Sequence, residues 1–410
     1  MDPTRILDQT VREAGDRIRA ALAIRFRDLD MAEEALAFAS LKAMETWSRD
    51  GPPRDPAAWL YAVGRRRAFD LGRRAKVRNA AVFDPPEPAH DPESVLMAAF
   101  EPIPDERLRL IFVCCHPALA PEARIALTPR THCGLSVERI ARAWLTTESA
   151  MLQRLTRAKR KIRDARIRFE IPGPDAWHDR LDAVLATLEI AYAQAYEDAA
   201  GLSDAAELAG ETLRLSGLLA DLLPNEPEVL GLAALIRLAE SRRPARLDGA
   251  GAMIPLTEQD VSLWDGRLIG QAALLLRRGL QIGRSGPYQL LAAIHAAHAS
   301  RRETGFTAWG DIATLYDYLL SVRPSPVAQV NRAVALAEAL GAEAGLQALA
   351  AVEGPARFID WLPYQAARAG LCAKAGRTEE AAEALRAALA LAPAPAERLF
   401  LARRLGELSA

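Results

Sequence analysis

The sequence lacks the features on which disulfide-rich and membrane-embedded proteins are built. Only four cysteines occur in 410 residues, and three of them fall within residues 114–133. So few, clustered thiols cannot form a disulfide framework in a chain of this length, which favours a reducing compartment. The longest apolar runs, LLADLL and QAALLL, are far shorter than the ~20 residues of a helical membrane span. Because Asp2, Arg5 and Asp8 replace the apolar core of a signal peptide, we expect a cytoplasmic protein with no membrane partner.

Motifs that carry catalysis or bind cofactors are also missing. We find no GxxxxGK[ST], GxGxxG, HExxH or GxSxG pattern, so we predict no enzymatic activity and no cofactor. A zinc hypothesis is raised by Cys114, Cys115, His116, His132 and Cys133. The adjacent Cys-Cys-His ligands lack the spacing that lets two side chains converge on one ion. His295 and His298 form a second candidate pair without a further ligand pattern. We therefore expect buried thiols and core histidines, and no metal.

The runs of Val, Ile and Thr that strands require are absent, and Ala, Leu, Glu and Arg recur at helical spacing instead. This pattern predicts an all-α protein. Residues Thr10 to Trp47 are expected to form two or three amphipathic helices. Asp55 followed by Pro56 predicts an N-cap and a helix that continues to about Ala75, with apolar first turns and basic later turns.

The formal net charge of −1 hides two basic segments. Residues 54–78 carry eight Arg or Lys against two acidic residues, and residues 139–168 carry ten against two. Between them, residues 84–106 contain seven acidic residues and six prolines but no Lys or Arg. We interpret this stretch as an acidic, extended linker, and the basic segments as candidate contacts for nucleic acid.

The second basic segment is predicted to be a helix-turn-helix. Ser136 and Thr147 are suitable N-caps of two successive helices, with a tight turn between them. The second helix would bury Ala150, Met151, Leu155 and Ile162 and present its N-terminal polar residues outward. Such a helix fits the major groove, where its first turns reach base edges and its later cations hold phosphates. The alternative is a basic helix that only faces solvent.

From Trp177 onward the chain is rich in Ala and Leu, and one type of junction recurs. An apolar helix end, a proline and a new helix follow one another in LLPNEPEVLGL, VRPSPVAQVNRAVAL and LAPAPAERLFLARRL. The spacing of these junctions is close to multiples of the ~34-residue helix-pair repeat. The alternative is a helical bundle whose helices begin with proline. Residues 241–262 are expected to be a polar excursion between repeats. The last unit has the small residues and proline of a TPR repeat at Gly376, Ala381, Ala388 and Pro393.

These motifs together resemble a known family. CGLSVERIARAWLTTESAMLQRLTRAKRKIRDARI is similar to region 4 of extracytoplasmic-function (ECF) sigma factors, and DPAAWLYAVGRRRAFDLGRRAKV is similar to their regions 2.3 and 2.4. RLRLIFVCCHPALAPEA, SLWD, GPYQL and PSPVAQVNRAVA resemble the subgroup that carries a C-terminal TPR-like extension. The resemblance implies four segments: sigma region 2 at 1–80, the linker at 81–104, region 4 at 105–170, and the TPR-like extension at 175–410, with a boundary at residues 171–175.

The resemblance also implies partners and site residues. Core RNA polymerase and promoter DNA would be bound by the first two domains, and a further protein by the extension. For polymerase, the implied contacts are Asp30, Glu33, Glu34 and Leu41. For the −10 element, they are Trp59, Arg65, Arg66, Arg67, Arg73, Arg74 and Lys76. For the −35 element, they are Thr147, Glu148, Ser149, Leu152, Gln153, Arg154, Arg157, Lys159 and Arg160.

Several alternatives to these expectations stay open. Trp59 and Phe69 are also explained by core packing. The acidic linker either threads the polymerase cleft in place of nucleic acid or is an ordinary tether. At the level of function, a helix-turn-helix regulator with a TPR-like sensor would bind DNA without polymerase. A TPR-like scaffold whose sigma module has degenerated would bind neither DNA nor polymerase.

Overall fold

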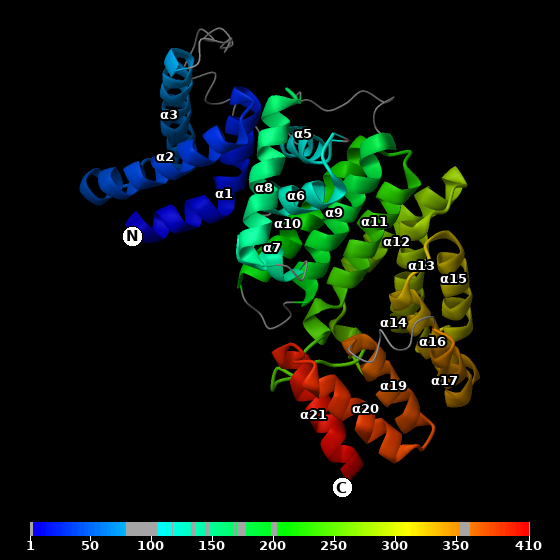
Figure 1. Ribbon diagram of the computed structural model, residues 1–410. Coiled ribbons are helices and arrows are strands. Elements are labelled where there is room, and N and C mark those ends of the chain that lie inside the picture. Colours follow the sequence, from blue (N-terminus) through cyan, green and yellow to red (C-terminus); the bar gives the residue numbers. More distant parts are fainter. Residues whose placement is uncertain are drawn as a thin grey trace. The chain divides into compact units, whose positions relative to one another are not determined.

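A computed structural model gives the fold of the chain (Figure 1). The described residues contain helices and a single isolated β-bridge, between Leu247 and Met253, and no strand. The predicted all-α class is therefore confirmed for this part of the chain. Within it, no helix has the length and apolarity needed to cross a membrane. The structure describes residues 3–78, 105–116, 118–132, 136–143, 147–167, 169, 178–197, 203–352 and 361–409.

The chain divides into two compact units, residues Met1–Ala191 (unit 1) and Tyr192–Ala410 (unit 2). The division falls inside helix α9 (His178–Glu197), whereas the sequence predicted a boundary at residues 171–175, which lie outside the described residues. The first half of α9 belongs to unit 1 because Arg180 donates to the carbonyl of Phe112 at 3.3 Å. The linker predicted at residues 81–104 also lies outside the described residues.

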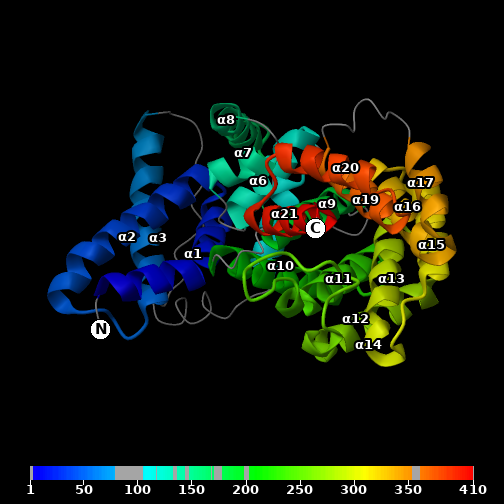
Figure 2. The same cartoon turned by 90° about the horizontal axis from the view of Figure 1, so that it is seen from below.

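Unit 1 begins with three long helices that pack against one another: α1 (Pro3–Phe26), α2 (Leu29–Asp50) and α3 (Pro56–Arg78) (Figure 2). The start of α3 agrees with the sequence, since the Asp55 carboxylate accepts a hydrogen bond from the Ala58 amide at 2.9 Å. A side-chain oxygen in this position satisfies an amide that has no partner within the helix. Helix α3 ends at Arg78, a few residues beyond the expected end at about Ala75.

Aromatic pairs fix how these three helices cross. The rings of Phe26 and Phe69 meet edge to face at 5.1 Å, and those of Trp47 and Trp59 meet at 5.4 Å. Such perpendicular contacts add to the free energy gained from burial. Gly64 allows α3 to approach α2 closely, since an added Cβ would lie 3.4 Å from the Ala35 carbonyl oxygen.

The next four described helices of unit 1, α5 to α8, are shorter, and α8 is the longest of them. α6 and α7 both pack on α8, and α1 packs on α5 and α6. The helices predicted to begin after the caps Ser136 and Thr147 are present as α7 and α8. The bounds are α5 (Asp105–Cys114), α6 (Pro121–His132), α7 (Val137–Ala143) and α8 (Glu148–Asp164).

The expectation of buried thiols is confirmed for the two cysteines at the end of α5. Both are fully buried, and the Cys114 thiol lies 3.3 Å from the Thr131 hydroxyl. Burial raises the pKa of Cys114 to about 12 and that of Cys115 to about 11. Since metals bind the thiolate, a thiol held neutral in this way is a poor ligand. Cys133 lies outside the described residues.

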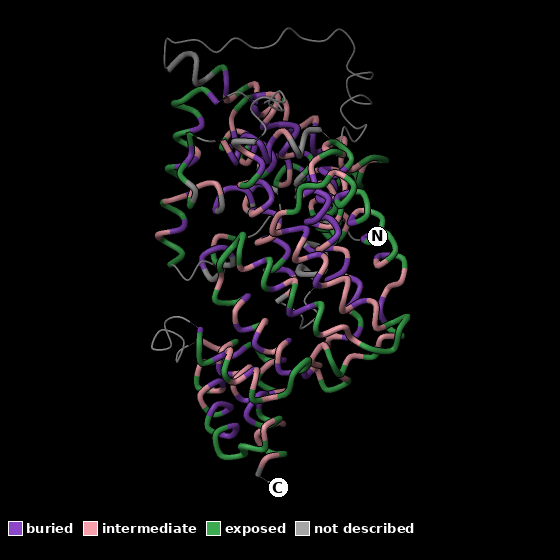
Figure 3. The backbone as a smooth tube through the Cα atoms, turned by 90° about the vertical axis from the view of Figure 1, so that its right-hand side faces the viewer, coloured by how far each residue is buried: buried purple, intermediate pink, exposed green. Residues whose placement is uncertain are grey.

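In unit 2 most of the extensively packed elements are neighbours in sequence, as in α11 with α12, α16 with α17 and α19 with α20, while α11 also packs on α13. The three proline junctions are confirmed as helix starts, because α11, α16 and α21 begin at Pro227, Pro326 and Pro395. Figure 3 colours the described residues of the chain by burial, and buried, half-buried and exposed residues follow one another along its helices. The helices are α10 (Ser203–Leu222), α11 (Pro227–Ser241), α12 (Gly266–Ile282), α13 (Pro287–Ala299), α14 (Arg301–Thr304), α15 (Trp309–Val322), α16 (Pro326–Leu340), α17 (Ala342–Ala350), α19 (Leu362–Lys374), α20 (Thr378–Ala390) and α21 (Pro395–Ser409).

The last helix hairpin carries the small residues that the sequence singled out. Gly376 joins α19 to α20 with a φ of 74°, a conformation that glycine adopts without strain. Ala381 and Ala388 are fully buried on α20, where small side chains let neighbouring helices approach. This placement agrees with a TPR-like unit, and assignment of the whole extension to that repeat class stays a prediction.

Beyond Ser241, the last residue of α11, the excursion predicted at residues 241–262 lies outside the α-helices, and it is held by residues from the middle of unit 2 and from its last helix. Arg301 donates to the carbonyls of Thr257 and Gln259 at 2.9 and 2.8 Å. Arg403, on α21, bonds to the Asp248 carboxylate at 2.8 Å. The segment therefore connects the last helix to the middle of unit 2 and is more than a loop between adjacent repeats.

Candidate nucleic-acid interface

Helix α8, the centre of the predicted helix-turn-helix, has a well-formed N-terminus. Thr147 takes an extended conformation and its hydroxyl accepts a hydrogen bond from the Ala150 amide at 3.2 Å. Glu148 stands in the first turn, where a negative charge is favoured by the helix dipole. Both features keep the first turn of α8 in a fixed, solvent-exposed position.

The buried residues of α8 lie on one face. Met151, Leu155, Ala158 and Ile162 are buried, and they recur at the spacing of one helical stripe. Three of the four predicted core residues are therefore confirmed, while Ala150 is only half-buried. Because successive residues are rotated by about 100°, the position of each remaining side chain follows from this stripe.

The face of α8 opposite its core is polar and basic. Ser149, Gln153 and Arg160 stand there, and all three are exposed. Arg157 is exposed at the edge of this face and donates to the Gln153 carbonyl at 3.3 Å. Of the other predicted −35 contacts, Thr147, Glu148 and Leu152 are exposed and Arg154 is half-buried. One helix thus presents most of the predicted set to solvent.

One flank of α8 faces helix α2 instead. Lys159 forms ion pairs with Glu33 at 2.7 Å and with Asp30 at 3.2 Å, and only 13% of its side chain is exposed. Arg163, one turn further on, pairs with Asp30 at 3.3 Å. A predicted DNA contact and two predicted polymerase contacts are therefore bound to each other. Arg163 is one of the later cations of this helix that were predicted to hold phosphates. The pairing itself was not predicted, because Lys159 and Glu33 are 126 positions apart in the chain and Arg163 and Asp30 are 133.

The basic residues of α3 are more constrained than those of α8. Arg67 pairs with Glu34 at 2.7 Å and stacks over the Phe38 ring at 4.8 Å. Arg73 pairs with Asp70 at 3.1 Å. Arg66 is exposed and Arg65 half-buried, while the side chains of Arg74 and Lys76 lie outside what the structure describes.

The aromatic residues expected near single-stranded DNA belong mainly to the core. Trp47 and Tyr61 are 1% and 5% exposed. Trp59 is half-buried and lies against Trp47. This arrangement favours the packing alternative for Trp59, since a ring that stacks on a base needs a free face.

The predicted polymerase contacts gather on one side of α2. Asp30, Glu34 and Leu41 are all exposed at helical spacing, with 61% of Leu41 accessible. Met44, 53% exposed, continues the same stripe and was not in the predicted set. Glu33 is half-buried, and both it and Asp30 pair with cations of α8. An exposed pair of large apolar side chains beside carboxylates is typical of a protein-binding surface.

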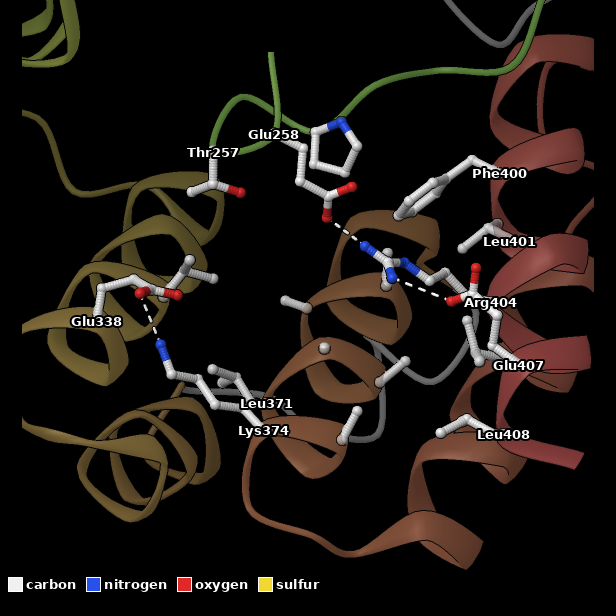
Figure 4. A pocket seen from close by; sticks show the side chains of 18 residues that line it. Thr257, Glu258, Glu338, Leu371, Lys374, Phe400, Leu401, Arg404, Glu407 and Leu408 are labelled. Atoms are coloured by element: carbon white, nitrogen blue, oxygen red, sulfur yellow. Dashed lines mark hydrogen bonds and ion pairs between the residues drawn. The ribbon is translucent and has the colours of Figure 1, made fainter. Parts of the chain in front are cut away.

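Unit 2 contains a cavity of about 470 Å³ that the sequence analysis did not find (Figure 4). Small residues of α19, including Ala366 and Gly370, form one wall. Ion pairs stand at its rim: Lys374 with Glu338 at 2.6 Å, and Arg404 with Glu258 and Glu407. Its size falls in the range of ligand-binding pockets.

The candidate histidine pair is part of the core of unit 2. The Arg242 guanidinium lies 3.0 Å from Nδ1 of His295, and the His298 ring meets Trp309 edge to face at 5.2 Å. Burial lowers the pKa of His298 to about 4 and that of His295 well below its usual value. Both histidines are half-buried by accessible surface, so the expectation of core histidines is met in part. Among the described residues, no group of three or more metal-ligating side chains is found.

Comparison with known proteins places the chain in a family. It is 40% identical over 418 aligned residues to an uncharacterized protein of Rhizobium meliloti (strain 1021), with 100% of this chain and 97% of that protein covered. The chain therefore belongs to the same family as that protein. Residues 180–280 match a family of unknown function, DUF6596. No solved structure matches the chain.

Proposed function

We propose that the protein is an ECF-type sigma factor that directs core RNA polymerase to promoters. The observation that carries the proposal is helix α8. It is capped by Thr147, buries one face against its own unit and exposes an opposite face of polar and basic residues. In proteins that read DNA through a helix-turn-helix, a helix of this kind enters the major groove.

The bundle at the start of unit 1 supports the polymerase part of the proposal. Leu41 and Met44 are large, apolar and exposed on α2, the helix that also exposes the carboxylates Asp30 and Glu34. This stripe is the surface through which we propose that polymerase is bound. Exposed Arg66 on α3 would meet DNA near the −10 element, together with the other α3 cations.

The extension is proposed to act through protein contacts. Its packed helix pairs are of the kind that forms extended binding surfaces in repeat proteins. The cavity beside Gly370 is the place where we expect a partner segment to contribute to regulation.

Run-off transcription with purified core polymerase tests the proposal directly. We expect the full chain to co-purify with core polymerase and to start transcripts at specific sites, while Leu41→Ser removes both activities. Leu340→Ser is the matched control because it replaces another exposed leucine in unit 2, 73% accessible against 61% for Leu41.

Failure to bind polymerase would overturn the proposal. If the chain then still bound DNA through α8, the alternative of a regulator that acts without polymerase would be favoured. If it bound neither, the scaffold alternative would gain support.

A further inference from the structure

We propose that the contact between α8 and α2 is an autoinhibitory latch, which must open before unit 1 can hold both DNA and polymerase. The inference rests on the proposed function, because it concerns the surfaces assigned there. It goes beyond that function in stating how the free protein keeps these surfaces occupied.

The first line of evidence is the position of Lys159. Its ammonium lies 2.7 Å from a Glu33 carboxylate oxygen and 3.2 Å from one of Asp30, and only 13% of its side chain is exposed. Lys161, two residues further along the same helix, is exposed. A cation that is covered and paired with two carboxylates cannot at the same time neutralise a phosphate.

The second line of evidence is that the contact spans more than one turn. Arg163 adds a pair with Asp30 at 3.3 Å, so two cations of α8 meet two carboxylates of α2. Networks of several charges hold better than isolated surface pairs. They also weaken as salt rises, because the partly exposed charges are screened.

The third line of evidence is the identity of the groups. Asp30 and Glu33 come from the proposed polymerase contacts, and Lys159 comes from the proposed DNA contacts. In the closed arrangement the α2 carboxylates cover the Lys159 ammonium, and Lys159 covers part of these carboxylates. DNA and the α2 carboxylates compete for the same ammonium group, so DNA binding and exposure of the α2 surface are coupled.

Zero-length crosslinking with a carbodiimide, applied to the full chain, tests the latch. The reagent joins an amine to a carboxylate only where the two are in contact. We expect a Lys159–Glu33 link in the free protein, and its yield should fall at least threefold when a mixed-sequence DNA duplex is bound at low salt. The Lys374–Glu338 pair, at 2.6 Å in unit 2, is the internal control, and its link should be unchanged by DNA.

A matched pair of variants gives a second readout. Glu33→Gln removes one charge from α2, that of the nearer of the two carboxylates that hold Lys159, so that Lys159 is held by Asp30 alone at 3.2 Å. Glu45→Gln removes the same charge from the same helix and releases Lys42, which it binds at 2.6 Å. We expect Glu33→Gln to bind the duplex about fivefold more tightly than Glu45→Gln, with a salt slope steeper by about one because one more cation reaches a phosphate.

The outcomes separate the latch from the function it regulates. If the free protein gives no Lys159–Glu33 link while the control link forms, the latch is wrong. If DNA binds but leaves that link unchanged, or if the two variants bind equally, the latch is also wrong and the proposed function survives. If neither wild type nor Glu33→Gln binds DNA, the proposed function fails together with the inference. Loss of folding in Glu33→Gln, seen by circular dichroism, would leave the wild-type crosslink as the deciding measurement.

Discussion

The two units use their charged residues differently. In unit 1 the ion pairs Lys159–Glu33 and Arg67–Glu34 join residues proposed to bind DNA and polymerase. In unit 2 comparable pairs, such as Arg403–Asp248, tie an irregular segment to the last helix. In unit 1, ion pairs therefore hold groups that are proposed to bind DNA or polymerase. In unit 2, ion pairs hold elements of the fold together.

Acidification should destabilise unit 2 through its core histidines. The pKa of His298 falls from 6.5 to about 4 because burial and the cations Arg242 and Arg301 disfavour its charged form. Between these values the unfolded chain binds more protons than the folded chain, so stability decreases as pH falls. This contribution is fully present above pH 6.5 and is lost toward pH 4, up to about 3 kcal/mol.

Calorimetric unfolding at several pH values measures this effect. The variant His298→Gln should show a smaller decrease in the melting temperature of unit 2 between pH 6.5 and pH 4 than the wild type. An equal decrease in both proteins would mean that His298 does not carry the pH dependence.

Replacing exposed arginines of unit 1 should weaken DNA binding, whereas replacing exposed arginines of unit 2 should leave it unchanged. Arg157→Ala together with Arg160→Ala removes two exposed cations from the outer face of α8. We expect about a 100-fold loss of DNA affinity and a salt slope reduced by about two, one for each lost phosphate contact. The control is Arg277→Ala with Arg278→Ala, two exposed arginines on α12 of unit 2. Equal losses for the two double variants, measured by salt-dependent titration, would remove the distinction between the units.

Close helix contacts should make unit 2 less tolerant of added volume than unit 1. An added Cβ at Gly231 would lie 2.6 Å from the Gln289 amide nitrogen, whereas at Gly64 the nearest atom is a Leu22 methyl at 3.2 Å. Overpacking against backbone should cost about 2 kcal/mol for Gly231→Ala. Gly64→Ala should cost less, because a side chain can move. Urea unfolding of both variants checks this order, and a larger cost at Gly64 would contradict it.

The smallest effect on stability is expected at the cavity of unit 2. A Cβ at Gly370 meets no atom within 4 Å, so Gly370→Leu should fill the cavity and change the free energy of unfolding by less than about 0.5 kcal/mol. We expect run-off transcription to fall while DNA binding by α8 is retained. Unchanged transcription would show that the cavity takes no part in regulation. Gly210→Leu, on α10 and also in open space, is the control.

Much of the local structure was determined by the sequence alone. The caps at Asp55 and Thr147 and the new helices that follow the three proline junctions were predictable, because capping and proline geometry depend on residues a few positions apart. The stripe of Met151, Leu155 and Ile162 was predictable for the same reason, since helical periodicity records which face is buried.

Only the tertiary structure decided which of these groups are available. Lys159 and Arg160 are adjacent cations in the sequence, yet one is covered by carboxylates from α2 and the other is exposed. Trp59 lies against Trp47, and the cavity at Gly370 brings together α16, α19, α21 and the excursion at residues 255–258. Local rules cannot foresee such meetings, because they depend on how helices far apart in the chain pack. The sequence therefore determined where the charges and helices are, and packing determined which charges are free to bind.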